Sequence, residues 1–80
     1  MPTVLRWRGY RFFFYANERQ EPAHVHVRKG GCEAKIWLHD YSVAFNLGYS
    51  PRELNEIVRT VRAEQQQIRK AWDEFLGDRR

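Results

Sequence analysis

The C-terminal third of the chain carries a complete set of helix signals, and these limit what the rest of the chain can fold into. Ser50 is typical of an N-cap, Pro51 suits the first helical position, and Glu53 completes a capping box with Ser50. Apolar residues then recur at the helical period, namely Leu54, Ile57, Val58, Val61, Ile68, Trp72 and Phe75. Gly77 supplies a C-terminal stop. We therefore expect one long helix over residues 51–76.

Residues 3–47, before this helix, form short apolar and alternating runs separated by turns. These runs predict strands over residues 3–7, 10–15, 23–29 and 32–38, and over 42–47 either a short fifth strand or an extended approach to the helix. Gly30-Gly31, between the third and fourth runs, predicts a hairpin. We therefore expect an α+β fold in one domain over residues 1–80. A small antiparallel sheet of four or five strands would pack on the long C-terminal helix.

The composition favours a small protein of the cytoplasm. Eighty residues form one domain with a small core, to which an aromatic content of 15% adds large apolar area. The single cysteine, Cys32, excludes an intramolecular disulfide and favours a reducing compartment. No apolar run approaches the roughly 20 residues that a membrane span needs, and the N-terminus lacks the apolar region of a signal peptide. We expect a soluble cytoplasmic protein without membrane contact.

The positive charge of the chain is concentrated at one end. The net charge is +4. Residues 1–30 hold six basic and two acidic side chains, whereas residues 31–80 hold eight of each. The excess therefore surrounds the first strands and favours a polyanion or an acidic protein as partner. The alternative is that the charge only keeps a small protein in solution.

Two of the three histidines lie two residues apart in a predicted strand. Alternation along that strand puts His24, His26 and Arg28 on one face and Val25 and Val27 on the other. Because histidine changes its charge near neutral pH, the pair is the strongest candidate for chemistry or anion binding. The alternative is a neutral, hydrogen-bonded pair that lies in a polar core layer beneath the helix.

Side chains of the neighbouring strands would equip the histidine face for RNA. Cleavage of RNA without a metal ion needs a base, an acid and cations that stabilise the phosphorane charge. We assign the base and acid roles to His24 and His26, with no metal and no cofactor. Cations would bind the phosphate and aromatic rings would stack an unpaired base. The expected nucleic-acid contacts are Arg11, Tyr15, Arg28, Lys35 and Trp37.

A metal site is a weaker interpretation of the same histidines. A His-x-His pair on a strand can supply two ligands, and His39, Asp40 or Cys32 are the candidates for a third. No Cys-x-x-Cys or Glu-x-x-His pattern supports such a site. Cys32 is better explained as a small packing residue, because nothing nearby in the sequence specifically lowers its pKa.

The end of the predicted helix is the candidate surface for a protein partner. A helix over residues 51–76 would be about 39 Å long, whereas a seven-residue strand reaches about 23 Å. The overhang would leave Trp72, Phe75 and Leu76 to be covered by the N-terminal strand, by a second copy or by another protein. The helix also has a basic flank, consisting of Arg52, Arg59, Arg62, Arg69 and Lys70, which either contacts phosphates or is simply solvated.

Several segments of the chain, in this order, match a known pattern. They are Tyr10–Tyr15 with Asn17-Glu18, then Glu21–Val27, Gly30-Gly31, Ala34–Leu38 and Gly48–Leu54. Together they resemble the uncharacterised bacterial domain-of-unknown-function family 4160, which has no established activity. Members are similar in size, and many are encoded beside a second small uncharacterised protein. The resemblance therefore implies a component of a toxin–antitoxin pair.

Two hypotheses about function follow from the sequence. The first is a small toxin–antitoxin-like protein that acts on RNA or binds it through the histidine face, as a metal-independent ribonuclease in its enzymatic form. The second is a non-catalytic binding or regulatory module, antitoxin-like or a structural partner of a second small protein. Replacement of the two histidines would abolish activity only under the first hypothesis.

Overall fold

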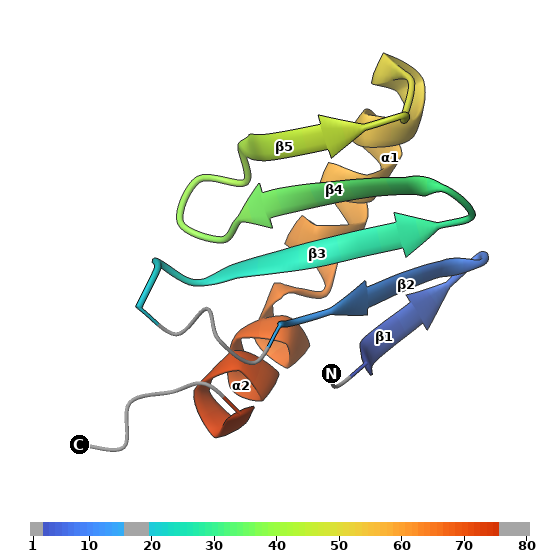
Figure 1. Cartoon of the computed structure of the whole chain (residues 1–80). Coiled ribbons are helices and arrows are strands. Elements are labelled where there is room, and N and C mark those ends of the chain that lie inside the picture. The colour runs from blue at the N-terminus through green and yellow to red at the C-terminus, as the bar shows by residue number, and fades with distance from the viewer. Residues whose placement is uncertain (1–2, 16–19, 76–80) are drawn as a thin grey trace.

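The computed structural model describes residues 3–15 and 20–75, which form one antiparallel sheet and two helices (Figure 1). The strands are β1 (Thr3–Trp7), β2 (Tyr10–Phe13), β3 (His24–Lys29), β4 (Cys32–Trp37) and β5 (Val43–Leu47). The helices are α1 (Pro51–Ala63) and α2 (Gln65–Phe75). The strand order is β1-β2-β3-β4-β5, so each strand pairs only with its neighbours in sequence. Both helices lie on the same side of the sheet (Figure 1).

The α+β class and the antiparallel sheet, expected to have four or five strands, are confirmed, and the sheet has five. The single long helix is wrong. The helical region consists of a 13-residue and an 11-residue helix that are separated at Glu64. The interruption is local, because the Glu64 N–H still donates to Thr60 O and the Ile68 N–H donates to Glu64 O. Buried apolar residues occur on both sides of it, with Ile57 and Val61 in α1 and Ile68 and Trp72 in α2.

The start of α1 follows the predicted capping box. The Ser50 hydroxyl accepts from the Glu53 N–H at 3.2 Å, and the Glu53 carboxylate accepts from the Ser50 N–H at 2.9 Å. Two backbone donors that a helix end leaves without partners are thereby satisfied. The helix therefore begins at Pro51 as expected.

The hydrophobic core lies between the helices and one face of the sheet. The sheet side contributes Phe12, Phe14, Val25, Val27, Ala34, Ile36 and Leu38, all fully buried. The helices contribute Ile57, Val61, Ile68 and Trp72. Val4, Leu5 and Trp7 of β1 pack against the same cluster.

Trp72 belongs to this core and does not extend beyond the sheet as the sequence predicted. Its side chain is 8% exposed, and its ring centroid lies 5.2 Å from that of Phe14. The helix end is covered within the chain, because α2 packs beside β1, the N-terminal strand that was one of the three expected covers. Phe75 is 43% exposed, whereas Leu76 lies outside the described residues.

A tight junction joins β5 to α1. Gly48 has φ +98°, and Tyr49 follows it with its hydroxyl 3.3 Å from Val27 O and 3.2 Å from Cys32 O. Burial of the Tyr49 ring raises the pKa of its hydroxyl to about 12. The Asn46 side chain also donates to Tyr49 O and accepts from the Tyr49 N–H. The junction thus fixes where α1 starts relative to β3 and β4.

Replacement of Gly48 by alanine is expected to lower the free energy of unfolding by about 2–3 kcal/mol. A Cβ at this position would lie 2.7 Å from Cys32 Sγ, and the positive φ is unfavourable for any L side chain. Gly31→Ala is the matched control, because it has open space around the added methyl group. Chemical denaturation of the two variants measures the difference. Equal stabilities would show that the junction relaxes without cost.

Candidate functional site

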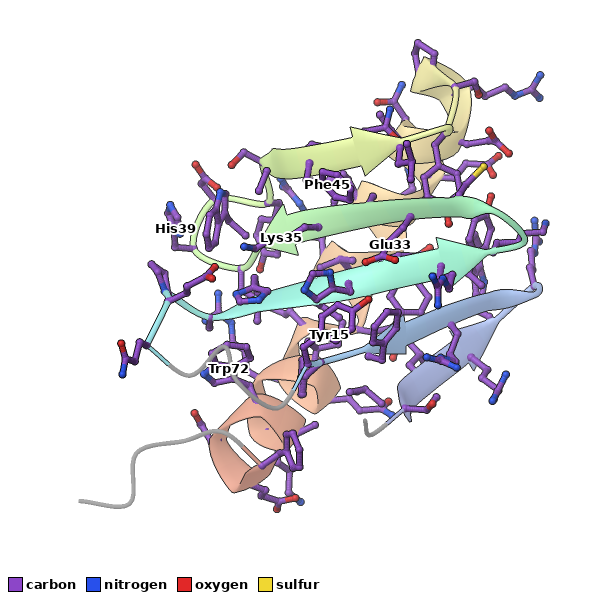
Figure 2. All side chains as sticks on the ribbon, viewed as in Figure 1. Tyr15, Glu33, Lys35, His39, Phe45 and Trp72 are labelled. Atoms are coloured by element: carbon purple, nitrogen blue, oxygen red, sulfur yellow. The ribbon has the colours of Figure 1, made fainter. Side chains whose placement is uncertain are left out.

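The face of the sheet opposite the helices carries most of the polar side chains of the strands. We call it the helix-free face. Side chains directly opposite one another on paired strands point to the same face. The register therefore places His26 between Phe13 and Lys35, with Phe45 beyond Lys35. Figure 2 shows Tyr15, Glu33, Lys35 and Phe45 in front of the sheet, on the side turned away from α1.

All seven residues that the sequence predicted for the site lie at this face, and the ring of His24, at the start of β3, also contacts Trp72 of α2. The seven residues are Arg11, Tyr15, His24, His26, Arg28, Lys35 and Trp37. The alternation in β3 explains this, since Val25 and Val27 fill the core on the other side. The histidine rings are neighbours, with centroids 5.3 Å apart.

Both histidines are nevertheless buried. His26 is 5% exposed, because the Phe13 ring stacks on it at 5.5 Å and the Tyr15 ring meets it edge-on at 4.5 Å. His24 is fully buried, and its Nδ1 lies 2.8 Å from Pro22 O. Its ring also contacts that of Trp72, with centroids 5.0 Å apart.

Glu33 of β4 is the residue that connects the site, and the sequence analysis missed it. Its carboxylate accepts a hydrogen bond from the Tyr15 hydroxyl at 3.1 Å. The same oxygen lies 3.3 Å from His26 Nδ1, and the other oxygen lies 3.6 Å from Arg28 Nε. The Glu33 side chain is only 14% exposed. The carboxylate is therefore hydrogen-bonded to a tyrosine and lies beside a histidine and an arginine in a position that is itself largely excluded from water.

The signal that could have found Glu33 is the Gly30-Gly31 hairpin. A two-residue turn between β3 and β4 puts residue 33 opposite residue 28, and the structure has this register. A carboxylate opposite Arg28 and diagonal to His26 was therefore within reach of the sequence.

The rim of the site combines cations with aromatic rings. The Lys35 ammonium pairs with the Glu21 carboxylate and lies 4.7 Å from the centroid of the Trp37 ring. Phe45, directly opposite Lys35, is 45% exposed. Arg28 keeps half of its side chain accessible to solvent. The rim thus offers exposed ring surface and positive charge beside the buried histidines.

The residues of the metal interpretation do not come together. His39 and Asp40 form a pair of their own on the turn after β4, with 3.6 Å between His39 Nε2 and Asp40 Oδ2. Hydrogen bonds from the Ser42 hydroxyl and N–H lower the pKa of the Asp40 carboxyl. Over residues 3–15 and 20–75, no group of three or more potential ligands could hold an ion. Cys32 packs against the core, as its size suggested.

No helix in the described ranges is long and apolar enough to span a membrane.

A family model described as "Domain of unknown function (DUF4160)" matches residues 9–73, from the turn before β2 almost to the end of α2. The matched segment contains the helix-free face from Arg11 to Phe45. Neither the curated proteins nor the solved structures give a match.

Proposed function

The chain belongs to the DUF4160 family of domains of unknown function, and from the geometry of its helix-free face we propose that it binds and cleaves RNA. The observation that carries this proposal is the Glu33 carboxylate, which lies within 3.3 Å of His26 Nδ1 and accepts from Tyr15. A carboxylate beside one imidazole nitrogen orients the ring and favours its protonated form during proton transfer. The second nitrogen of the ring then exchanges the proton with substrate.

The proposed reaction is transesterification within the RNA chain. The ribose 2′-oxygen attacks the adjacent phosphorus, the bond from phosphorus to the 5′-oxygen breaks, and a 2′,3′-cyclic phosphate forms. His26 Nε2 takes the proton from the 2′-hydroxyl, and Lys35, directly across from His26, gives a proton to the leaving 5′-oxygen. Arg28 stabilises the charge on the phosphorane. The step needs no oxidant, reductant or metal ion.

The burial of the histidines separates their roles. His24 is enclosed by the rings of Trp37, Trp72 and His26, so it serves as a positioning residue for His26. His26 lies at the surface end of this pair, under the edge of Tyr15. Substrate therefore reaches His26 by displacing the Tyr15 ring, whose stacking position an unpaired base can take.

Incubation of the purified protein with single-stranded RNA tests the proposal. We expect fragments that end in 2′,3′-cyclic phosphate, in equal yield with and without a chelator, because no step uses a metal ion. A matched DNA strand is the control and should remain intact, since it lacks the 2′-hydroxyl. Intact RNA, or cleavage that the chelator abolishes, would contradict the mechanism.

A second candidate function, binding of another small protein without catalysis, is favoured by β5. All five residues of this edge strand are exposed, and Val43, Phe45 and Leu47 are 39%, 45% and 57% exposed. An apolar strand edge without charge or proline is a surface on which another chain can add a strand. In a toxin–antitoxin pair, which the resemblance implies, the protein described here would then be the binding partner and not the nuclease. RNA would then remain uncleaved in the incubation described above.

A further inference from the structure

Three arginines lie side by side across the first three strands of the sheet. The register pairs Arg6 of β1 with Arg11 of β2, and Arg11 with Arg28 of β3. We call these three residues the arginine row. Directly opposed residues share a face, so all three belong to the helix-free face. Adjacent strands are about 4.8 Å apart, so the row spans about 10 Å.

This arrangement is unfavourable for the folded chain on its own. Like charges directly opposite each other on a sheet are destabilising. Glu33 is the next residue in the same row; its carboxylate lies 3.6 Å from Arg28 Nε, accepts from the Tyr15 hydroxyl and lies beside His26 Nδ1. In the described part of the chain, no ion pair reaches Arg6 or Arg11.

Arg11 is the member of the row whose buried hydrogen-bond donors are unused within the described ranges. Its Nε and Nη2 atoms are buried, and neither has a hydrogen-bond partner among the described residues. Its guanidinium lies over the Phe13 ring, with Cζ 4.6 Å from the ring centroid. The ring holds the guanidinium in place without using its donors. A planar group with two unused N–H donors matches the oxygens of a phosphate.

We propose that the arginine row is a phosphate-binding site, with Arg11 at its centre and Arg6 and Arg28 on either side. The ligand is a phosphate group of a nucleic-acid strand, either a phosphodiester within it or a terminal phosphomonoester. The site rests on the helix-free face as the RNA surface of the proposed function, but it does not depend on cleavage. It lies beside the row that contains Phe13, His26 and Lys35, and Arg28 borders the reacting phosphate. Arg6 and Arg11 therefore hold the phosphate one position along the strand.

The test is the replacement of Arg11 by methionine, which removes the charge and the donors but keeps an apolar side chain over Phe13. Lys29→Met is the matched control. Like Arg11, Lys29 lies over an aromatic ring, in this case that of Tyr10, but it belongs to β3 and not to the arginine row. The substitution removes the same charge outside the arginine row. Titration calorimetry with inorganic phosphate, at constant ionic strength, measures binding to each protein.

We expect Arg11→Met to weaken phosphate binding by about 10- to 100-fold, as the loss of charge-assisted hydrogen bonds predicts, and Lys29→Met to leave it nearly unchanged. In chloride buffer, Arg11→Met should unfold at a higher temperature than the wild type, because the repulsion within the row is relieved. Equal weakening in the two variants, or no phosphate binding by the wild type, would overturn the proposal.

Two further arms identify the source of the phosphate and separate this site from cleavage. If a 5′-phosphorylated oligonucleotide binds more tightly than its 5′-hydroxyl form, the ligand is a terminal phosphomonoester. If the two forms bind equally, the ligand is a phosphodiester within the strand. A His26→Asn variant should bind inorganic phosphate like the wild type even if RNA is never cleaved. Loss of phosphate binding in that variant would overturn a site centred on Arg11.

Discussion

Replacement of His26 by asparagine is expected to lower the rate of RNA cleavage by about 10²- to 10⁴-fold, the usual contribution of a general base. Asparagine keeps a polar group near the Glu33 carboxylate, so the fold should persist, but it cannot take a proton from the ribose. Single-turnover rates on a short RNA measure the effect. Thermal denaturation of the same sample checks that the variant is folded.

The third histidine of the chain provides the control for this variant. His39 lies on the turn after β4 with 63% of its side chain exposed. His39→Asn makes the same chemical change outside the site and should cleave RNA at the wild-type rate. If the two variants cleave equally, the activity does not come from His26, and a contaminating nuclease is the simplest explanation.

Replacement of Trp72 by alanine is expected to cost about 3–5 kcal/mol of the free energy of unfolding, as is typical of a buried tryptophan. An 80-residue domain has about 4–12 kcal/mol in total, so the variant should be largely unfolded or close to it. The reason is the contact of the indole with both Phe14 and His24, which joins α2 to the sheet. Urea denaturation followed by circular dichroism gives the value.

Phe75→Ala is the matched control on the same helix, because Phe75 is 43% exposed. We expect its loss of stability to be below about 1 kcal/mol. Sedimentation of both variants and the wild type also examines the helix end as a partner surface. Self-association that is lost in Phe75→Ala would place the contact at the end of α2. In the denaturation experiment, equal losses of stability in the two variants would mean that Trp72 is not part of the core.

Local signals in the sequence were sufficient for the first four strands and for the start of the first helix. Ser50, Pro51 and Glu53 satisfy the backbone of the first helical turn among themselves, so the start of α1 depends on nothing distant. Gly30-Gly31 likewise fixes the hairpin of β3 and β4. The orientation of His24 and His26 follows from the alternation of a single strand.

The break at Glu64 and the buried position of Trp72 could not be predicted from local signals in the sequence. Apolar residues keep the helical period across residue 64, and no proline or glycine marks the interruption. Whether Trp72 is covered depends on Phe14 and His24, which lie far away in the chain. Such contacts are a property of the assembled layers and leave no local pattern.

The face on which the predicted site residues lie could be predicted from the sequence, whereas the contacts between them could not. The face shared by the residues follows from strand alternation and pairing. The burial of His24, in contrast, depends on Trp37 and Trp72 together, and the role of Glu33 depends on Tyr15 reaching across β3. A sequence pattern gives the face on which a side chain lies, whereas its partners depend on register and on side-chain length.

The order of the strands has a consequence for how the protein is completed during synthesis. Each strand pairs with its predecessor, so the sheet can form hairpin by hairpin as the chain leaves the ribosome. The last helix closes the longest loop, since the Gln67 side chain donates to Val4 O over 63 residues. Until α2 is made, the side of His24 that Trp72 contacts stays open to water. The histidine pair therefore reaches its final surroundings only after Trp72 has been translated and α2 has packed on the sheet.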